Sequence, residues 1–155
     1  MKKVLFIASG GGHLTELLQL EPLILKYDAT LVSEKTKTTL YLKERYDDVY
    51  LLAYGTKDHL FRYLFIFMFN ILYSLYIFLK KRPDIIITTG THTAVPMCYI
   101  AHLFKKKVIF IETFANITTP TMAGKLVYKI ADKFIVQWPE LLEIYPKAEY
   151  WGCLF

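Results

Sequence analysis

Length, composition and charge narrow the class of protein first. A chain of 155 residues, 54% of them hydrophobic, supplies enough apolar material for the core of one domain, which excludes a disordered or low-complexity protein. The formal net charge of +5 favours anionic partners such as membrane lipids, phosphates or nucleic acid. The two cysteines, Cys98 and Cys153, are too few for a disulfide scaffold or a metal cluster, so no metal is expected.

Short β-branched runs alternate with longer helical stretches along the chain. Each gap between runs leaves room for a helix, which predicts an α/β fold: a Rossmann-like parallel sheet with helices on both faces. The N-terminus enters the first run without a secretory signal, so a cytoplasmic location is expected. The predicted strands are Lys3 to Ala8, Ala29 to Ser33, Val49 to Ala53, Asp84 to Thr88, Lys107 to Ile111 and Lys133 to Val136.

The first strand leads into a loop of three glycines, Gly10, Gly11 and Gly12, followed by His13. A loop without side chains lets backbone amides approach a phosphate, and the helix that follows points its positive end at the same place. The alternative is a plain strand-to-helix turn that only glycine can make. Ligands of such sheets bind at the carboxyl ends of the strands, so the loops after the first, fourth and fifth strands are predicted to share one rim.

A nicotinamide-dependent oxidoreductase is the first enzyme class to test against the glycine loop. The loop matches the dinucleotide fingerprint only in part, because Thr15 stands where the third glycine is expected, although Glu34 could hold a ribose. This class remains a remote alternative, and no cofactor is expected. Nucleic acid is not expected as a partner, because the basic runs Lys80 to Arg82 and Lys105 to Lys107 lack interleaved aromatic residues.

The stretch from Leu60 to Leu79 is apolar and long enough to cross a bilayer. A crossing would divide the strands of one sheet between two sides of a membrane. We therefore predict a membrane-associating helix at about residues 58–81 that lies in the membrane interface, with burial in a protein interface as the alternative. The predicted anchors are the aromatic and basic residues Phe61, Phe65, Phe69, Lys80, Lys81 and Arg82.

Several motifs, taken together, resemble a known family. The motifs are Ser9 to His13 with Glu16 behind them, Thr89 to Thr91 leading to Pro96, Phe110 to Ala115, Gly124 to Leu126, and Ala131 to Glu140. They resemble the membrane-associated, acceptor-side subunit of two-chain UDP-sugar glycosyltransferases. That family contains the anchoring subunit of the dolichol-pathway N-acetylglucosaminyltransferase and its bacterial capsule or exopolysaccharide counterparts. The resemblance spans essentially the whole chain.

The resemblance implies that residues 1–155 form a single Rossmann-like domain, equivalent to the N-terminal half of a GT-B glycosyltransferase. It implies a separate partner chain that binds most of the UDP-sugar, a lipid-linked (polyprenyl diphosphate) saccharide as acceptor, and no activity of this chain alone. The expected location is the cytoplasmic face of the cell membrane. A bacterial protein is favoured, because the eukaryotic form usually carries a membrane segment ahead of the first strand.

Sugar transfer needs a base near the acceptor hydroxyl and positive character near the diphosphates. Under the resemblance, His13 is the candidate base or diphosphate-positioning residue, and Glu112 is a candidate for orienting the acceptor or His13. The alternative is a non-catalytic membrane adaptor that recruits and activates the partner and tolerates the loss of His13. Substrate or diphosphate contacts are expected from Gly10, Gly11, Gly12, Glu16, Thr89, Gly90, Thr91 and His92.

The stretch Glu149 to Phe155 reads as a final short strand followed by large apolar residues. Free tails are normally polar, and large aromatic residues are typical anchors of protein interfaces. Trp151, Leu154 and Phe155 are therefore predicted to contact the partner chain. The alternative is that these side chains close the sheet of this domain itself.

Overall fold

The computed structural model describes residues 1–55 and 60–154 as a parallel sheet between two layers of helices. The strand order is β3-β2-β1-β4-β5-β6-β7, and every neighbouring pair is parallel. The strands are β1 (Lys3–Ala8), β2 (Asp28–Glu34), β3 (Val49–Leu52), β4 (Ile85–Gly90), β5 (Lys107–Ile111), β6 (Lys133–Val136) and β7 (Glu149–Tyr150). The helices are α1 (Gly12–Leu18), α2 (Glu21–Lys26), α3 (Leu42–Arg45), α4 (Leu60–Lys81), α5 (Val95–Leu103), α6 (Met122–Val127) and a short 3-10 helix (Pro139–Glu143).

The predicted fold class is confirmed, and all six predicted strands are present. β1, β5 and β6 have the predicted bounds, and the other three differ only at their ends. The largest difference is in β4, which begins at Ile85 and continues through Thr89 and Gly90. The predicted final strand is short, because pairing with β6 involves only Glu149 and Tyr150.

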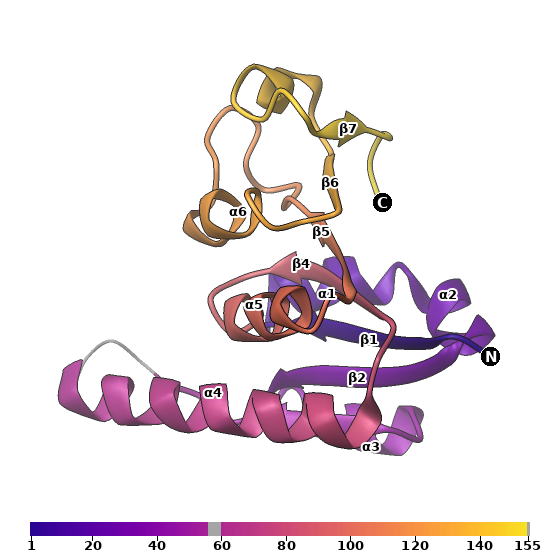
Figure 1. Ribbon diagram of the computed structural model, residues 1–155, viewed down its shortest axis with the longest axis vertical. Coiled ribbons are helices and arrows are strands. Elements are labelled where there is room, and N and C mark those ends of the chain that lie inside the picture. The colour runs from indigo at the N-terminus through magenta and orange to yellow at the C-terminus, as the bar shows by residue number, and fades with distance from the viewer. Residues whose placement is uncertain (56–59, 155) are drawn as a thin grey trace.

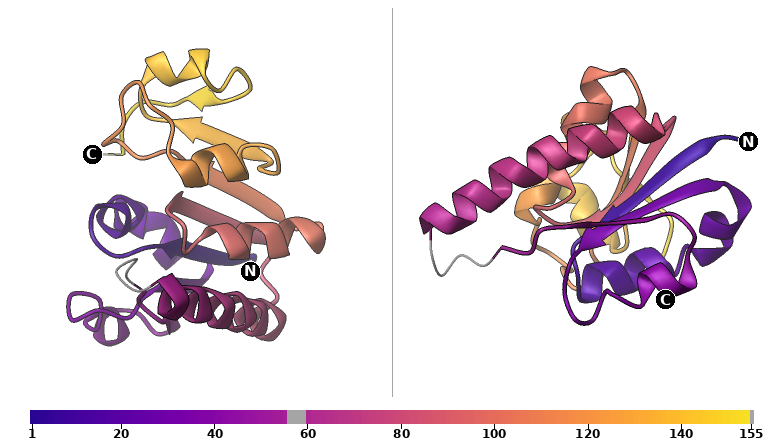
Figure 2. Two further views of the ribbon diagram at one scale, coloured as in Figure 1. Left: turned by 90° about the vertical axis from the view of Figure 1, so that its left-hand side faces the viewer. Right: turned by 90° about the horizontal axis from the view of Figure 1, so that it is seen from below.

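Helices cover both faces of the sheet, as Figure 1 and Figure 2 show. Along β1, Leu5 and Ile7 join the core under α4, α5 and α6, whereas Val4 and Phe6 join the core under α1, α2 and α3. Successive side chains of a strand point to opposite faces, so an unbroken apolar strand requires two covered faces. Cys98 is buried in the first of these cores, and burial raises the pKa of its thiol to about 12.

Helix α4 connects β3 to β4 and packs one side against the sheet. Its buried residues Ser74, Ile77 and Phe78 lie in the second half of the helix. The Asn70 side chain accepts a hydrogen bond from the Ala53 amide (2.9 Å) and donates one to the Ala53 carbonyl (2.8 Å), which fixes the helix to the end of β3. By length and composition alone, the segment Phe61–Lys81 could also cross a membrane.

The predicted membrane anchors of α4 fall into two groups in the structure. Phe61, Phe65 and Phe69 are exposed, as a membrane contact requires. Lys80 and Lys81 instead fold back on the protein. Both amines lie over the Tyr50 ring, at 5.5 and 5.3 Å, and Lys81 also pairs with Asp48 at 2.6 Å. Arg82 is exposed.

Candidate functional site

The glycine loop forms an open turn between β1 and α1. Gly11 has a φ of +78°, a backbone conformation that residues other than glycine rarely adopt. A Cβ atom on Gly11 or Gly12 would meet nothing within 4 Å, so the loop is open to an approaching ligand. The amides of Gly12 and His13 have no hydrogen-bond partner within the described part of the chain, as expected for the first turn of a helix.

His13 and Thr89 hold each other at the meeting point of α1 and β4. The His13 Nδ1 atom lies 2.8 Å from the Thr89 carbonyl, and the Thr89 hydroxyl donates to the His13 carbonyl at 2.6 Å. A carbonyl oxygen only accepts, so Nδ1 carries the hydrogen and the neutral ring keeps the lone pair on Nε2. The ring is half-buried, and Nε2 has no hydrogen-bond partner among residues 1–55 and 60–154. The arrangement leaves one basic nitrogen beside the glycine loop.

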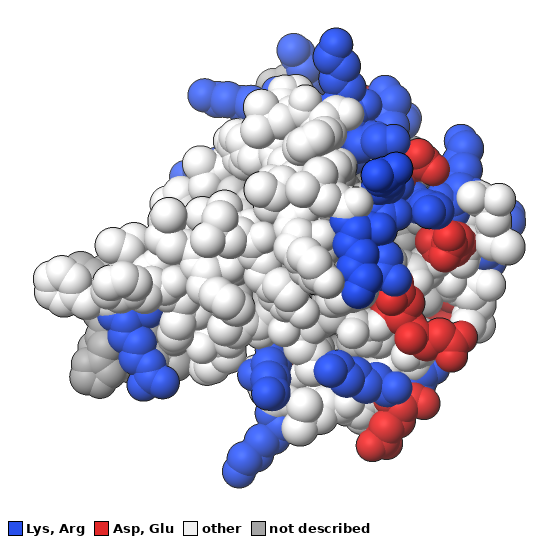
Figure 3. Space-filling view, turned by 60° about the horizontal axis from the view of Figure 1, so that its bottom comes forward, with Lys and Arg blue, Asp and Glu red and all other residues white. Residues whose placement is uncertain are grey.

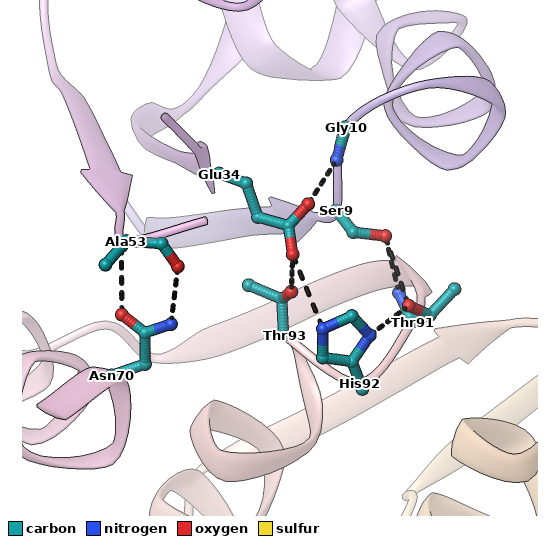
Figure 4. Close-up of polar contacts among 8 residues, drawn as sticks. All are labelled: Ser9, Gly10, Glu34, Ala53, Asn70, Thr91, His92 and Thr93. Atoms are coloured by element: carbon teal, nitrogen blue, oxygen red, sulfur yellow. Dashed lines mark hydrogen bonds and ion pairs between the residues drawn. The ribbon is translucent and has the colours of Figure 1, made fainter. Parts of the chain in front are cut away.

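The buried carboxylate of Glu34 joins the ends of β1, β2 and β4 (Figure 4). It accepts hydrogen bonds from the Gly10 amide (3.2 Å) and from the Thr93 hydroxyl, and it lies 3.5 Å from Nε2 of His92. Nδ1 of the same histidine is 3.0 Å from the Thr91 hydroxyl. The predicted ribose role of Glu34 therefore competes with contacts that already occupy both of its oxygens.

The carboxylate of Glu16 is buried behind the glycine loop, where it reaches the loops after β5 and β6. It accepts hydrogen bonds from the Thr113 hydroxyl (2.6 Å), the Phe114 amide (3.3 Å) and the Gln137 side chain (3.1 Å). These contacts favour a scaffolding role over the predicted contact with substrate, because burial hides this carboxylate from a ligand.

Glu112 is fully buried at the end of β5. Its oxygens accept hydrogen bonds from the hydroxyl and amide of Thr121 (2.8 and 3.2 Å) and from the hydroxyl of Tyr145 (3.0 Å). Burial and the neighbouring Glu112 raise the pKa of Tyr145, which keeps its hydroxyl protonated as the donor. A group that acts on substrate must be reachable, so this geometry favours a positioning role for Glu112 over the predicted catalytic one.

The structure brings most of the predicted site residues to one rim. Those that are at least partly exposed there include Gly11, Gly12, His13 and His92. Thr91 links the loop after β4 to the loop after β1, because its hydroxyl lies 3.2 Å from that of Ser9. Sequence reasoning missed the partners of the buried carboxylates, which are Thr93, Thr113, Thr121, Gln137 and Tyr145. The polar residues after β4 and β5 were a local signal for Thr93, Thr113 and Thr121, but not for Gln137 and Tyr145, which come after β6.

Two apolar cavities lie close to the rim. One, of about 310 Å³, opens beside His92 between Tyr63 and Phe67 of α4 and Met122 and Leu126 of α6. The other, of about 240 Å³, lies on the opposite face of the sheet, against residues that include Ile87, Ile109, Ile135, Trp151 and Leu154. No group of three or more His, Cys, Asp or Glu side chains in the described ranges is arranged to hold a metal ion.

The predicted interface residues near the end of the chain differ in exposure. Trp151 is 63% exposed, and its indole nitrogen donates to Glu149 at 2.9 Å. Leu154 packs against the core under α1 and α2, and its amide donates to the Gln137 side chain at 2.9 Å. Leu154 thus packs on this domain itself, which for this residue favours the alternative over a partner contact. Phe155 lies outside the described residues.

Solved structures define the class of fold. The chain is similar to MurG of Acinetobacter baumannii, with a TM-score of 0.73 and 15% identity over 90% of this chain and 43% of that one. It is also similar to the UDP-N-acetylglucosamine 2-epimerase of Rickettsia bellii, with a TM-score of 0.74 and 16% identity over 99% of this chain and 45% of that one. The chain therefore has the fold of about half of a GT-B-type protein.

Sequence relatives define the family. Residues 53–154 match the family described as "Oligosaccharide biosynthesis protein Alg14 like". A UDP-N-acetylglucosamine transferase subunit ALG14 from Candida albicans is 38% identical over 56% of this chain and 42% of its own length. The subunit of the same name from Mus musculus is 28% identical over 97% of this chain and 82% of its own length. The chain belongs to the Alg14-like family, although it spans less than half of the Candida relative.

The contacts of Glu112 predict that Gly124→Ala is strongly destabilising. A Cβ atom on Gly124 would lie 2.1 Å from a Glu112 oxygen, 2.7 Å from the Tyr145 hydroxyl and 2.9 Å from the Thr121 hydroxyl, so all three would have to shift. We expect the free energy of unfolding to fall by about 3 kcal/mol in chemical denaturation. Gly12→Ala is the matched control, because its Cβ enters open space. Equal stability of the two variants would contradict the described packing.

Proposed function

We propose that the chain is the membrane-associated, acceptor-side subunit of a two-chain glycosyltransferase. The complex transfers a sugar, N-acetylglucosamine by analogy with the relatives, from its UDP derivative to a lipid-linked saccharide. The observation that carries this proposal is the membership of the Alg14-like family, whose relatives are named as UDP-N-acetylglucosamine transferase subunits. The fold is consistent with it, because GT-B enzymes react in a cleft between two domains and the described residues resemble one of them.

The glycine loop and His13 are the proposed contact with the acceptor. Bare amides at the start of α1 suit the diphosphate oxygens of a lipid-linked saccharide. The Thr89 carbonyl fixes the His13 tautomer, so Nε2 is free to accept the proton of the attacking sugar hydroxyl. In the protonated state the same ring would hold a diphosphate. Gly10, Gly90, Thr91 and His92 shape the rest of this rim, while Glu16, Glu34 and Glu112 hold it in position.

Helix α4 is the proposed contact with the membrane. Its exposed residues recur at helical spacing and include Phe61, Phe65 and Phe69, while Asn70 and Phe78 hold the other side on the protein. A helix that crosses a bilayer could not stay packed on the sheet. We therefore place α4 in the membrane–water interface on the cytoplasmic side. The predicted bacterial capsule or exopolysaccharide setting has no support from the two sequence relatives described above, which are eukaryotic, and is not part of this proposal.

A non-catalytic adaptor is the second candidate function. It is favoured by the small number of reachable polar side chains on the rim, since the carboxylates Glu16, Glu34 and Glu112 are buried. Such an adaptor would bind the membrane and the partner in the same way but would not need His13. A nicotinamide-dependent enzyme is disfavoured, because Glu34 is already bonded to Gly10 and Thr93.

His13→Ala is predicted to lower sugar transfer by the complex by about 10²- to 10⁴-fold, the usual contribution of a general base. The fold should survive, because the substitution removes one side-chain hydrogen bond, worth about 1 kcal/mol. Transfer is measured from labelled UDP-N-acetylglucosamine. The control is Thr15→Ala, because Thr15 is an exposed residue of α1 two positions after His13. Full turnover by the His13→Ala complex would exclude the base and support the adaptor.

Trp151 is the proposed anchor for the partner chain. Its ring is exposed yet held by Glu149 and by Lys133, whose amine lies 5.5 Å from the ring centre, and it borders the 240 Å³ apolar cavity. A preordered aromatic residue beside an apolar cavity is typical of an interface hot spot.

Trp151→Ala is predicted to weaken partner binding by about 30-fold, which corresponds to the 2 kcal/mol of a hot spot. Affinity is measured by copurification and titration of the partner chain. Tyr41→Ala is the control, because Tyr41 is an exposed aromatic residue next to α3, near the β3 edge and far along the strand order from β7. Unchanged affinity after Trp151→Ala would place the interface elsewhere.

A further inference from the structure

The three helices on one face of the sheet share an unusual charge distribution. α4, α5 and α6 contain no Asp or Glu, and the only acidic residues between Leu60 and Ala131 are Asp84 and Glu112. Asp84 pairs with Lys106 at 3.1 Å, and Glu112 is fully buried. The opposite face has mixed charge, with Glu44 and Arg45 both exposed on α3. One face of the molecule is therefore free of exposed negative charge on its helices.

The same three helices expose large apolar side chains over a continuous area. α4 and α5 meet through Phe78 and Phe104, whose ring centres are 5.1 Å apart, and the Tyr99 hydroxyl of α5 donates to the Leu126 carbonyl of α6 at 3.0 Å. Figure 2 shows the three helices side by side in one layer. The exposed apolar residues are Phe61, Leu64, Phe65, Met68, Phe69, Leu72, Tyr76 and Leu79 of α4, Tyr99 and Leu103 of α5 with Phe104, and Met122 and Leu126 of α6.

Basic residues border this apolar area. Figure 3 shows a broad uncharged surface around α4, with Lys and Arg at its margins and Asp and Glu beside them on the right-hand side. Apolar side chains ringed by cations suit a lipid surface, because the apolar groups enter the headgroup boundary while the cations meet anionic lipid. Exposed basic residues of these helices and their ends include Arg62, Arg82, Lys105, Lys125 and Lys129.

We propose that the outer faces of α4, α5 and α6 together form one docking surface for an anionic lipid bilayer. The membrane interface then receives two further apolar pairs beside the aromatic residues of α4. They are Leu103 and Phe104 at the end of α5, and Met122 and Leu126 of α6. This proposal rests on the proposed membrane association of α4 and extends it to the whole helical layer. The layer lies flat on the bilayer, which brings the 310 Å³ cavity beside His92 to the level of the lipid headgroups.

Site-directed fluorescence tests the proposal on the full chain. Single cysteines replace Phe65, Leu103 or Leu25, which are 77%, 76% and 74% exposed, in a Cys153→Ser background. Each is labelled with the environment-sensitive dye NBD; Cys98 is fully buried, which shields it from the dye. Leu25 on α2 is the matched control from the opposite face. The label is read with vesicles of phosphatidylcholine, with and without phosphatidylserine.

We expect brighter, blue-shifted emission at Phe65→Cys and Leu103→Cys with phosphatidylserine vesicles, and no change at Leu25→Cys. A response at Phe65→Cys without one at Leu103→Cys would overturn the three-helix surface and leave the membrane association of α4 intact. No response at either position would overturn both. An equal response with pure phosphatidylcholine would overturn the requirement for anionic lipid.

A charge substitution gives a second, independent readout. Leu103→Asp should weaken vesicle binding about tenfold, since it removes one buried leucine side chain from the docked state. Leu25→Asp, at matched exposure, should leave vesicle binding unchanged. Thermal unfolding monitored by circular dichroism confirms that both variants fold. Equal vesicle binding by the two variants would contradict the proposed surface.

Discussion

Three buried carboxylates hold the loops at the carboxyl end of the sheet, and the rest of the site depends on them. Burying a carboxylate is costly unless its oxygens are bonded, so each one fixes the loops that supply its donors. Glu34 joins the glycine loop to the loop after β4, Glu16 joins α1 to the loops after β5 and β6, and Glu112 fixes the start of α6. An open, glycine-rich turn thereby gains a defined position.

The two faces of the sheet differ in the contacts we propose for them. The face under α4, α5 and α6 is apolar and basic on the outside and suits a membrane, whereas the face under α1 and α2 carries the apolar cavity beside Trp151 and suits a protein partner. The rim with His13 lies at the strand ends between these faces. In the proposed function, the lipid-linked acceptor and the donor-binding partner approach the same histidine from two sides.

The fold was predictable because its signals are local. Runs such as Val108 to Ile111 show a buried strand on their own, and the polar residues after them mark the rim. The roles of the buried carboxylates were not predictable in this way. Glu16 accepts hydrogen bonds from Thr113, which is 97 residues further along the chain, and from Gln137, which is 121 residues further along. No local sequence pattern predicts such pairs. From the sequence, Gly124 is only part of a family motif, yet the absence of a side chain at this position is what leaves room for Glu112.

The most direct test of the central claim is sugar transfer by the chain with and without its partner. The tagged chain is isolated from membranes with the glycosyltransferase chain that copurifies, and each chain is also purified alone. Labelled UDP-N-acetylglucosamine and a polyprenyl diphosphate-linked saccharide are then supplied to all three samples. The account predicts labelled lipid-linked product from the complex only. Transfer by the isolated chain, or a folded, membrane-bound complex that transfers no sugar, would contradict it.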